Sequence, residues 1–285
     1  MGTERVITFE CRGESLLGIL HESGGSVPPV GLLIVVGGPQ YRVGSHRQFV
    51  LMARAFAAAG FPTLRFDYRG MGDSAATPQA FDAVDDDIRA AIDALLVAQP
   101  GLHRVIIFGL CDAASAAMIY APSDPRVVGL ILANPWVRSA SGEAKAYVKH
   151  YYAQRLLQAT FWNKVLSGEF DIRASLRDFL GKLRVAGDGR PRRADFVSRM
   201  LSGLSGFRYA VLFLISDRDL TADEFMDLCK SEPIWSKALS VPTRTVVRLQ
   251  DSDHTFSVGD SLARASHACV EWLRNDAGVA GVKRS

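Results

Sequence analysis

"VIIFGLCDAASAAMIY", residues 105–120, decides the fold. It begins as an apolar run typical of a buried β-strand and ends as a run of small residues typical of a helix, with a tight Gly-Leu-Cys-Asp-Ala turn between them. A strand that enters a helix through a turn of the form G-x-nucleophile-x-G lifts one side chain above the sheet. The same turn points the free N–H groups of the helix N-terminus at that side chain. Here Gly109 and Ala113 are the small flanking residues, and Cys111 occupies the tip.

Strands and helices are predicted to alternate on both sides of this turn. The apolar runs predict eight strands, over residues 5–13, 15–23, 30–38, 61–67, 104–110, 126–135, 209–216 and 243–250. Helical patterns follow over residues 45–60, 80–99, 112–121, 223–231 and 261–275, the first with Ser45 as N-cap and Gln48 completing a capping box. Such alternation predicts an α/β fold: a mostly parallel, eight-stranded sheet with helices on both faces.

The alternation stops between residues 138 and 208. This stretch is helix-prone and rich in aromatic residues, and it carries 14 Lys and Arg against 6 Asp and Glu. We interpret residues 138–208 as an inserted helical cap, and residues 1–137 and 209–285 as the core domain. The basic and aromatic residues of the insertion suit an acyl chain beside an anionic group, although a solvated helical surface explains the same charges.

Two further residues complete a predicted nucleophilic site with Cys111. His254 follows the last strand and precedes the last helix, and an acid is expected after the strand at 209–216. We favour Asp219 as that acid over Asp217, and expect the other of the two to cap the next helix or to pair with Arg218. Asp251 and Asp253 are weaker candidates, because residues so near His254 in sequence seldom reach its far ring nitrogen. This order predicts a Cys111–His254–Asp219 triad.

The loop after the third strand, "VVGGPQYRVGSH", is the expected source of oxyanion donors. Gly37 and Gly38 let the backbone approach a ligand closely. We assign the two donors to the N–H groups of Gly38 and Asp112, with Gln40 as the alternative. Four residues around the site are candidates for substrate binding: Gln40, Arg42, Arg47 and Trp136.

With these residues in place, the chain resembles the α/β-hydrolase superfamily over essentially its whole length. "FDYRGMGDS" resembles a superfamily segment (Asp67, Arg69, Gly70, Gly72 and Ser74) that braces the loops around the site, and "GGP" resembles an oxyanion loop with Val36 in place of its histidine. The combination of GGPQYR, FDYRGMGDS, GLCDAAS and NPW (134–136) is more specifically similar to the type-1 hydrolase of exosortase A systems. A cysteine at this turn also occurs in dienelactone hydrolases, but the long insertion and the GGPQYR loop disfavour that substrate class.

The composition limits the functions that need to be considered. A net charge of +3 gives no argument for nucleic-acid binding, and no apolar run is long enough to span a bilayer. The four cysteines show no metal or disulfide spacing, which favours a cytoplasmic location without cofactor or metal. We expect an ester or thioester hydrolase acting through an acyl-Cys intermediate on a small-molecule substrate, free or carried by CoA or an acyl-carrier protein. The alternatives are an acyltransferase or cyclase, and a binding protein without catalysis.

Overall fold

The computed structural model describes residues 3–24, 29–38, 40–137 and 192–275. The chain divides into two compact units, residues 1–137 with 199–285, and residues 138–198. Most of the predicted cap, residues 138–191, lies outside the described residues, and helix α7 (Arg192–Gly206) is the part that is described. The helical cap therefore stays a prediction.

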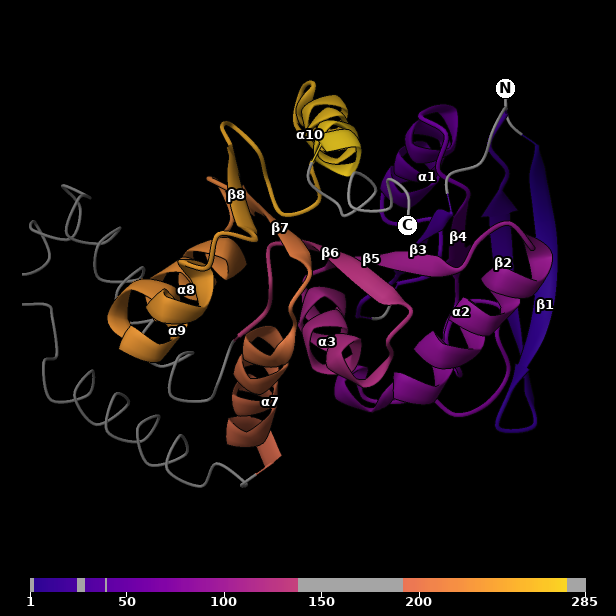
Figure 1. The fold of residues 1–285 in the computed structure, drawn as a ribbon, viewed down its shortest axis with the longest axis horizontal. Helices are drawn as coiled ribbons and strands as arrows, with labels where there is room; N and C mark the ends of the chain where they lie inside the picture. Colours follow the sequence, from indigo (N-terminus) through magenta and orange to yellow (C-terminus); the bar gives the residue numbers. More distant parts are fainter. Residues whose placement is uncertain (1–2, 25–28, 39, 138–191, 276–285) are drawn as a thin grey trace, which may run out of the picture. The chain divides into compact units, whose positions relative to one another are not determined.

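In the described part of the first unit, eight strands form one sheet (Figure 1). Its order is β1-β2-β4-β3-β5-β6-β7-β8, with β1 and β2 antiparallel to their neighbours and every pairing from β4 to β8 parallel. The predicted eight-stranded, mostly parallel sheet is confirmed. The strands are β1 (Glu4–Cys11), β2 (Glu14–His21), β3 (Val30–Val35), β4 (Thr63–Phe66), β5 (Arg104–Leu110), β6 (Val127–Ala133), β7 (Ala210–Ser216) and β8 (Arg244–Leu249).

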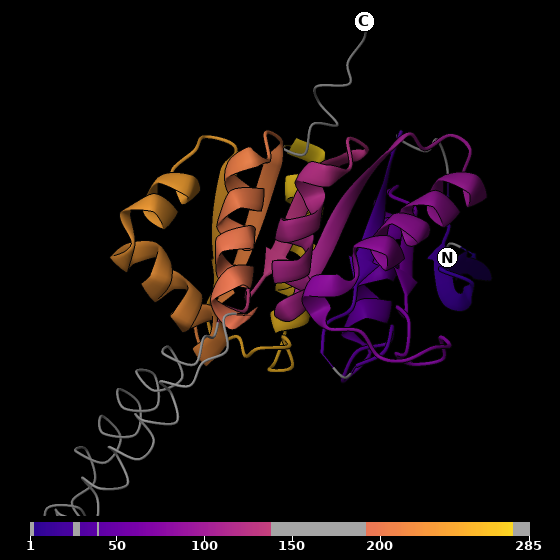
Figure 2. The same ribbon diagram turned by 90° about the horizontal axis from the view of Figure 1, so that it is seen from below.

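Helices cover both faces of this sheet. Helices α1 (Gln48–Ala58) and α10 (Ser261–Asn275) pack together on one face (Figure 1). Helices α2 (Asp85–Ala98) and α3 (Asp112–Tyr120) cover the other face, as the view from below shows (Figure 2). Residues 199–206 of α7 lie close to α3, because a Cβ added at Gly203 would be 2.1 Å from the Met118 carbonyl oxygen. Helices α8 (Leu220–Ser231) and α9 (Pro233–Leu239) connect β7 to β8.

The central strands are apolar because both of their faces are covered. Every residue of β3 and β6 is buried, and so is every residue of β5 after Arg104. Phe108 of β5 packs between Phe49 and Phe56 of α1, with ring centroids 6.3 Å apart in each pair. This two-sided burial explains why the continuous apolar runs of the sequence are strands of a parallel sheet.

The predicted start of α1 at Ser45 is wrong. The helix begins at Gln48, after Arg47, whose backbone is left-handed with φ 66°. The Gln48 side chain accepts a hydrogen bond from the His46 N–H at 3.2 Å. Gln48 therefore stabilises the turn before the helix and is not the distal half of a capping box.

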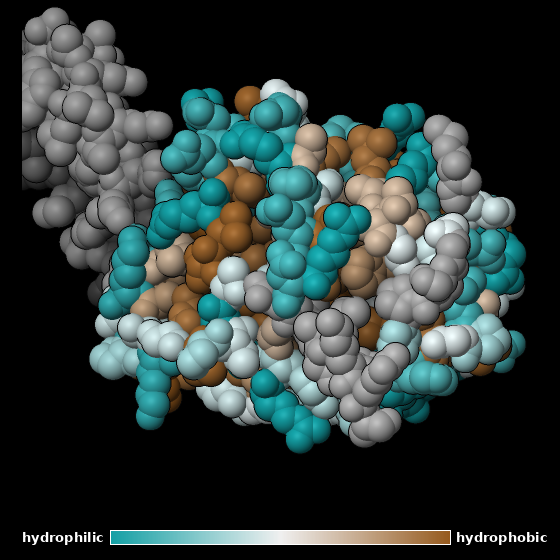
Figure 3. Space-filling model, turned by 45° about the horizontal axis from the view of Figure 1, so that its top comes forward, coloured by the Kyte–Doolittle hydropathy of each residue, from teal (hydrophilic) through white to brown (hydrophobic). Residues whose placement is uncertain are grey.

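The surface that carries α1 and α10 has apolar patches among polar residues (Figure 3). A groove of about 570 Å³ is lined there by residues of both helices, Leu51, Ala55, Leu262, Ala263 and Val270 among them. The sequence-predicted site residues are not among those that line it. Within the described residues, no helix is long and apolar enough to cross a membrane.

Replacing Gly109 with alanine is expected to lower the free energy of unfolding by about 1–3 kcal/mol, since overpacking a tight site has that cost. The added methyl group would lie 2.5 Å from the Ala113 carbonyl oxygen, inside the turn between β5 and α3. Gly101→Ala is the matched control, because nothing lies within 4 Å of its added Cβ. Urea unfolding of both variants measures the difference, and equal losses would contradict the crowding of the turn.

Candidate active site

Cys111 lies at the tip of the turn that joins β5 to α3. It is the N-cap residue of α3, and its backbone has φ 61° and ψ −125°, a conformation that non-glycine residues rarely adopt. Its N–H donates to the Ala133 carbonyl at 3.0 Å, and its own carbonyl accepts from the Trp136 N–H at 3.2 Å. The end of β6 thus holds the turn on both sides. As a residue Cys111 is half-buried, whereas the other three cysteines are buried.

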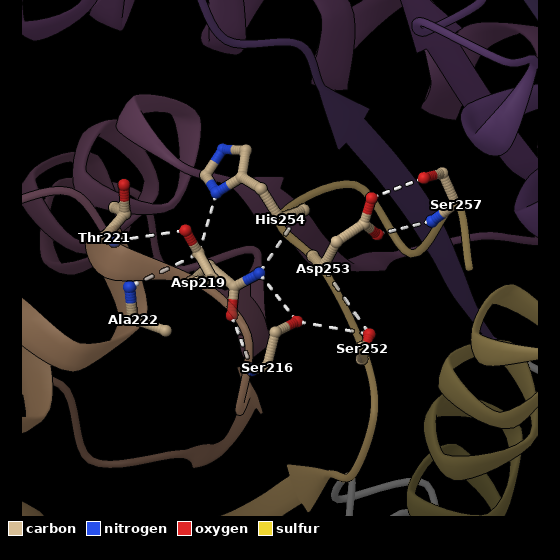
Figure 4. A network of polar contacts seen from close by, with 9 residues as sticks. Ser216, Asp219, Thr221, Ala222, Ser252, Asp253, His254 and Ser257 are labelled. Carbon is tan, nitrogen blue, oxygen red and sulfur yellow. Dashed lines mark hydrogen bonds and ion pairs between the residues drawn. The ribbon is translucent and has the colours of Figure 1, made fainter. Parts of the chain in front are cut away.

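His254 and Asp219 meet across the ends of two neighbouring strands. His254 lies in the loop after β8, and Asp219 follows β7 as the N-cap residue of α8. The His254 Nδ1 is 2.7 Å from the Asp219 Oδ2 (Figure 4). The Asp219 carboxylate also accepts the N–H groups of Thr221 and Ala222, which fixes its position.

The electrostatics of His254 link it to both predicted partners. Its pKa is raised to about 10, first by the hydrogen bond to Asp219 and next by the interaction with the Cys111 side chain, while burial opposes the rise. Because Nδ1 faces Asp219, Nε2 is the nitrogen left for Cys111. Because its pKa is about 10, the ring is protonated at neutral pH, so an imidazolium lies between the Asp219 carboxylate and the Cys111 thiol.

The other acids near His254 have different partners. Asp217 accepts the Ser252 N–H at 3.1 Å, and Asp251 pairs with Arg218. Asp253 accepts hydrogen bonds from Ser257 (Figure 4). The acid that does not face His254 was expected to cap α8 or to pair with Arg218. Capping by that acid is wrong, because Asp219 both faces His254 and caps α8. The charge of Arg218 does act on Asp217, while Arg218 forms its ion pair with Asp251.

Asn134, at the end of β6, ties the loops of the site together. Its Nδ2 donates to the Ser216 Oγ and to the His254 carbonyl, both at 3.0 Å, and its Oδ1 accepts the Ser216 N–H at 2.9 Å. The side chain is fully buried, and its backbone φ is 43°. In the sequence Asn134 is part of the NPW motif and was not predicted as a site residue. The available signal was a polar residue that ends an apolar strand.

The two predicted oxyanion donors are the N–H groups of Gly38 and Asp112, and both face the Asp112 carboxylate. Gly38 has φ +59°, and its N–H donates to the Asp112 Oδ2 at 2.9 Å. Asp112 is the first residue of α3. The alternative donor, Gln40, lies in the same loop as Gly38, and its Oε1 is buried without a hydrogen-bond partner among the described residues.

The candidate substrate-binding residues have different surroundings. The Arg42 guanidinium pairs with Asp67 and Asp73, which disfavours a role in holding an anionic substrate. Arg47 precedes α1 as its N-cap residue. The Trp136 ring lies edge-on to Phe81, 5.3 Å between centroids, and its backbone contacts Cys111. Trp136 thus contacts the nucleophile turn through its backbone, and the binding roles of all four candidates stay predictions.

The chain resembles known proteins in sequence and in fold. Residues 29–183, more than half of the chain, match the family described as serine aminopeptidase, S33. The chain belongs to this family. Its α/β-hydrolase fold, expected from the sequence motifs, is thereby confirmed. This S33-family chain has Cys111 at the turn where the family name implies a serine.

Solved structures share the fold at low sequence identity. An esterase of Pyrococcus furiosus, Pf2001, is 14% identical with a TM-score of 0.66, over 97% of this chain and 94% of that one. Est1E of Butyrivibrio proteoclasticus, solved with ferulic acid, is 15% identical with a TM-score of 0.62, over 95% and 98%. A dienelactone hydrolase of Anabaena variabilis is 14% identical with a TM-score of 0.62, over 97% and 99%. No curated protein sequence matches this S33-family chain significantly.

Metal ligands are not gathered at this site. Within the described ranges of the S33-family chain, no group of three or more His, Cys, Asp or Glu side chains is placed to hold a metal ion. The described residues offer the Cys111 thiol, the His254 imidazole and the Asp219 carboxylate, with the imidazole interacting with both other groups.

The raised pKa of His254 predicts a pH-dependent stability. The folded protein keeps a proton on the ring that the unfolded chain releases near 6.5, so this stabilisation is full below that pH and is lost as the pH rises through about 10. Asp219→Asn removes the main cause, so its deficit in unfolding free energy against the wild type should shrink between about pH 6 and about pH 9. Urea unfolding at both pH values tests this, with Asp260→Asn as control. A deficit independent of pH would contradict it.

Proposed function

We propose that this S33-family chain is a cysteine-dependent hydrolase that cleaves an ester or a thioester through an acyl-Cys111 intermediate. One observation carries the proposal: Cys111 lies at a strained strand-to-helix turn and interacts with His254, whose other nitrogen is 2.7 Å from Asp219. The order nucleophile, acid, histidine along the chain is the order that this fold uses.

The first half of the reaction forms the acyl-enzyme. The Cys111 thiolate attacks the acyl carbon, and the carbonyl electron pair moves to oxygen, where backbone N–H groups at the start of α3 stabilise the negative charge. When the tetrahedral species collapses, the bond from carbon to the leaving oxygen or sulfur breaks. The imidazolium of His254 gives its Nε2 proton to the leaving group, and Asp219 keeps the ring oriented.

The second half restores the thiolate. The neutral imidazole takes a proton from water as the water oxygen attacks the thioester carbon, the carbon–sulfur bond breaks, and the carboxylic acid leaves. A thioester is more reactive than an oxygen ester toward amines, so a non-water acceptor would turn the same site into an acyltransferase or cyclase. Product analysis with and without an added amine separates the two reactions. A substrate carried by CoA or an acyl-carrier protein fits this chemistry.

The narrower resemblance to exosortase-associated hydrolases belongs to this proposal as well. It depends on the GGPQYR, GLCDAAS and NPW segments. These segments surround Cys111 in space, because the loop of Gly38 contacts Asp112 and Trp136 contacts Cys111. Such a relationship points to an acyl substrate within a biosynthetic locus and does not specify the acyl group.

Iodoacetamide near neutral pH is expected to alkylate Cys111 well before the other cysteines. Cys11, Cys229 and Cys269 are buried, and burial raises the pKa of each thiol, to about 12 for Cys229. Intact-mass spectrometry with peptide mapping measures the order of labelling. The same instrument should detect a Cys111 adduct after incubation with acyl thioesters, absent in Cys111→Ala and retained in Cys229→Ala. Equal labelling of all four cysteines would refute an activated thiol.

Asp219→Asn is expected to lower kcat for a chromogenic ester by roughly 10²-fold or more, because the imidazole loses the partner that fixes its tautomer. Asparagine is also a good N-cap residue, so the start of α8 should survive the change. Asp217→Asn is the matched control, since this carboxylate lies two residues away and accepts the Ser252 N–H. Steady-state kinetics of both variants decide the matter, and a larger loss in Asp217→Asn would reassign the acid.

A further inference from the structure

The carboxylate of Asp112 lies among the N–H groups that should receive the substrate oxygen. Its Oδ2 accepts the Gly38 N–H at 2.9 Å. The N–H groups of Ala113 and of Asp112 itself also face this carboxylate and hold its charge. These groups come from the start of α3 and from the loop after β3, the two segments that form an oxyanion hole in this fold. The anion site is therefore filled by a side chain of the protein itself.

The fit of this side chain is close. A Cβ added at Gly37 would lie 1.9 Å from the Asp112 Oδ1, so only glycine leaves room for the carboxylate beside β3. The same Oδ1 is buried without a well-directed hydrogen-bond partner in the described part of the chain. One oxygen of the carboxylate thus occupies the position that the substrate oxyanion would take, and the other has an unmet capacity to accept a hydrogen bond.

We propose that Asp112 is a specificity-determining residue. Its carboxylate occupies the oxyanion hole of the free protein. It leaves the hole only when the bound acyl group carries a hydrogen-bond donor that binds the displaced carboxylate. This inference rests on the proposed function. A carboxylate and a substrate oxyanion cannot share the same N–H groups, and their like charges repel. Asp112 as a residue is only half-buried, so rotation about its side-chain bonds can carry the carboxylate away from Gly38.

The surroundings of Asp112 set the cost of that displacement. Burial raises the pKa of Asp112, while the N–H groups of Gly38, Ala113 and Asp112 and the charge of His254 oppose the rise. Tyr68, after β4, also faces the carboxylate, whose charge adds to the burial that raises the pKa of this phenol. Outside the hole, the carboxylate loses its N–H partners, so a hydroxyl or ammonium group on the acyl chain compensates by donating to it.

The decisive experiment compares butyryl and 3-hydroxybutyryl thioesters of N-acetylcysteamine in the wild type, Asp112→Ala and Asp112→Asn. Alanine removes both the obstruction and the charge, so kcat/KM for the butyryl thioester should rise roughly tenfold or more, since one oxyanion donor is worth about 10²–10³-fold in kcat. Asparagine keeps the shape without the charge and should give a smaller rise. The ratio of kcat/KM for the 3-hydroxybutyryl thioester to that for the butyryl thioester should fall more in Asp112→Ala than in Asp112→Asn. The control Asp260→Asn should leave kcat/KM for both substrates unchanged.

Alkylation by iodoacetamide separates this inference from the proposed function, because alkylation needs the thiolate and no oxyanion hole. The alkylation rates of the wild type and the variants are compared at a pH above which the rate for Cys111 no longer rises, and urea unfolding checks that each variant folds. An unchanged alkylation rate at this plateau, together with faster thioester turnover, supports the inference. Unchanged or slower butyryl turnover in both variants, or an equal rise for both substrates, overturns it. If Cys111 is not alkylated selectively even in the wild type, the proposed function itself fails.

Discussion

The turn from β5 into α3 is the constraint on which the rest of the site depends. Gly109 leaves no room for a Cβ against Ala113, and Cys111 takes a positive φ that places its side chain at the tip. Such backbone strain persists only where the surroundings determine it. Here Ala133, the last residue of β6, accepts the Cys111 N–H, and Trp136, just after β6, donates to the Cys111 carbonyl. The turn thus fixes the Cys111 thiol at the sheet edge beside the N–H groups of a helix. His254 and Asp219 must then be positioned relative to this thiol.

The histidine and the acid are positioned by a second, polar constraint. Asn134 bonds to Ser216 at the end of β7 and to the carbonyl of His254, so β6 sets the spacing of the two loops that must meet. Asp219 then serves two purposes, because the carboxylate that orients His254 also caps α8. A buried amide with its groups satisfied specifies one arrangement and leaves little freedom to relax. Precision at the site therefore comes from buried side chains of the sheet edge, while the loops themselves contribute the reactive groups.

Much of this arrangement follows from the sequence, and the exceptions have physical reasons. The central strands β3, β4, β5, β6 and β7 were predictable because two-sided burial gives continuous apolar runs. The meeting of His254 with Asp219 was predictable because parallel strands end at one edge of the sheet. The start of α1 was not, since a left-handed Arg47 ends the preceding turn and Gln48 bonds backward to His46. Asn134 and the position of the Asp112 carboxylate depend on contacts between segments far apart in sequence. Local patterns carry no information about such contacts.

The charges of the site also bear on why it has a sulfur. His254 is the cation among Cys111, Asp112 and Asp219, and Asp219 and Cys111 are the main causes of its raised pKa. In general, a thiol beside an imidazolium loses its proton more easily than a serine hydroxyl, which must lose its proton as it attacks. A site whose anion hole already holds a carboxylate opposes the build-up of further negative charge. In that setting a sulfur nucleophile that faces the positively charged His254 ring, and a substrate that donates a hydrogen bond to Asp112 as it binds, are the two parts of the proposed electrostatic arrangement.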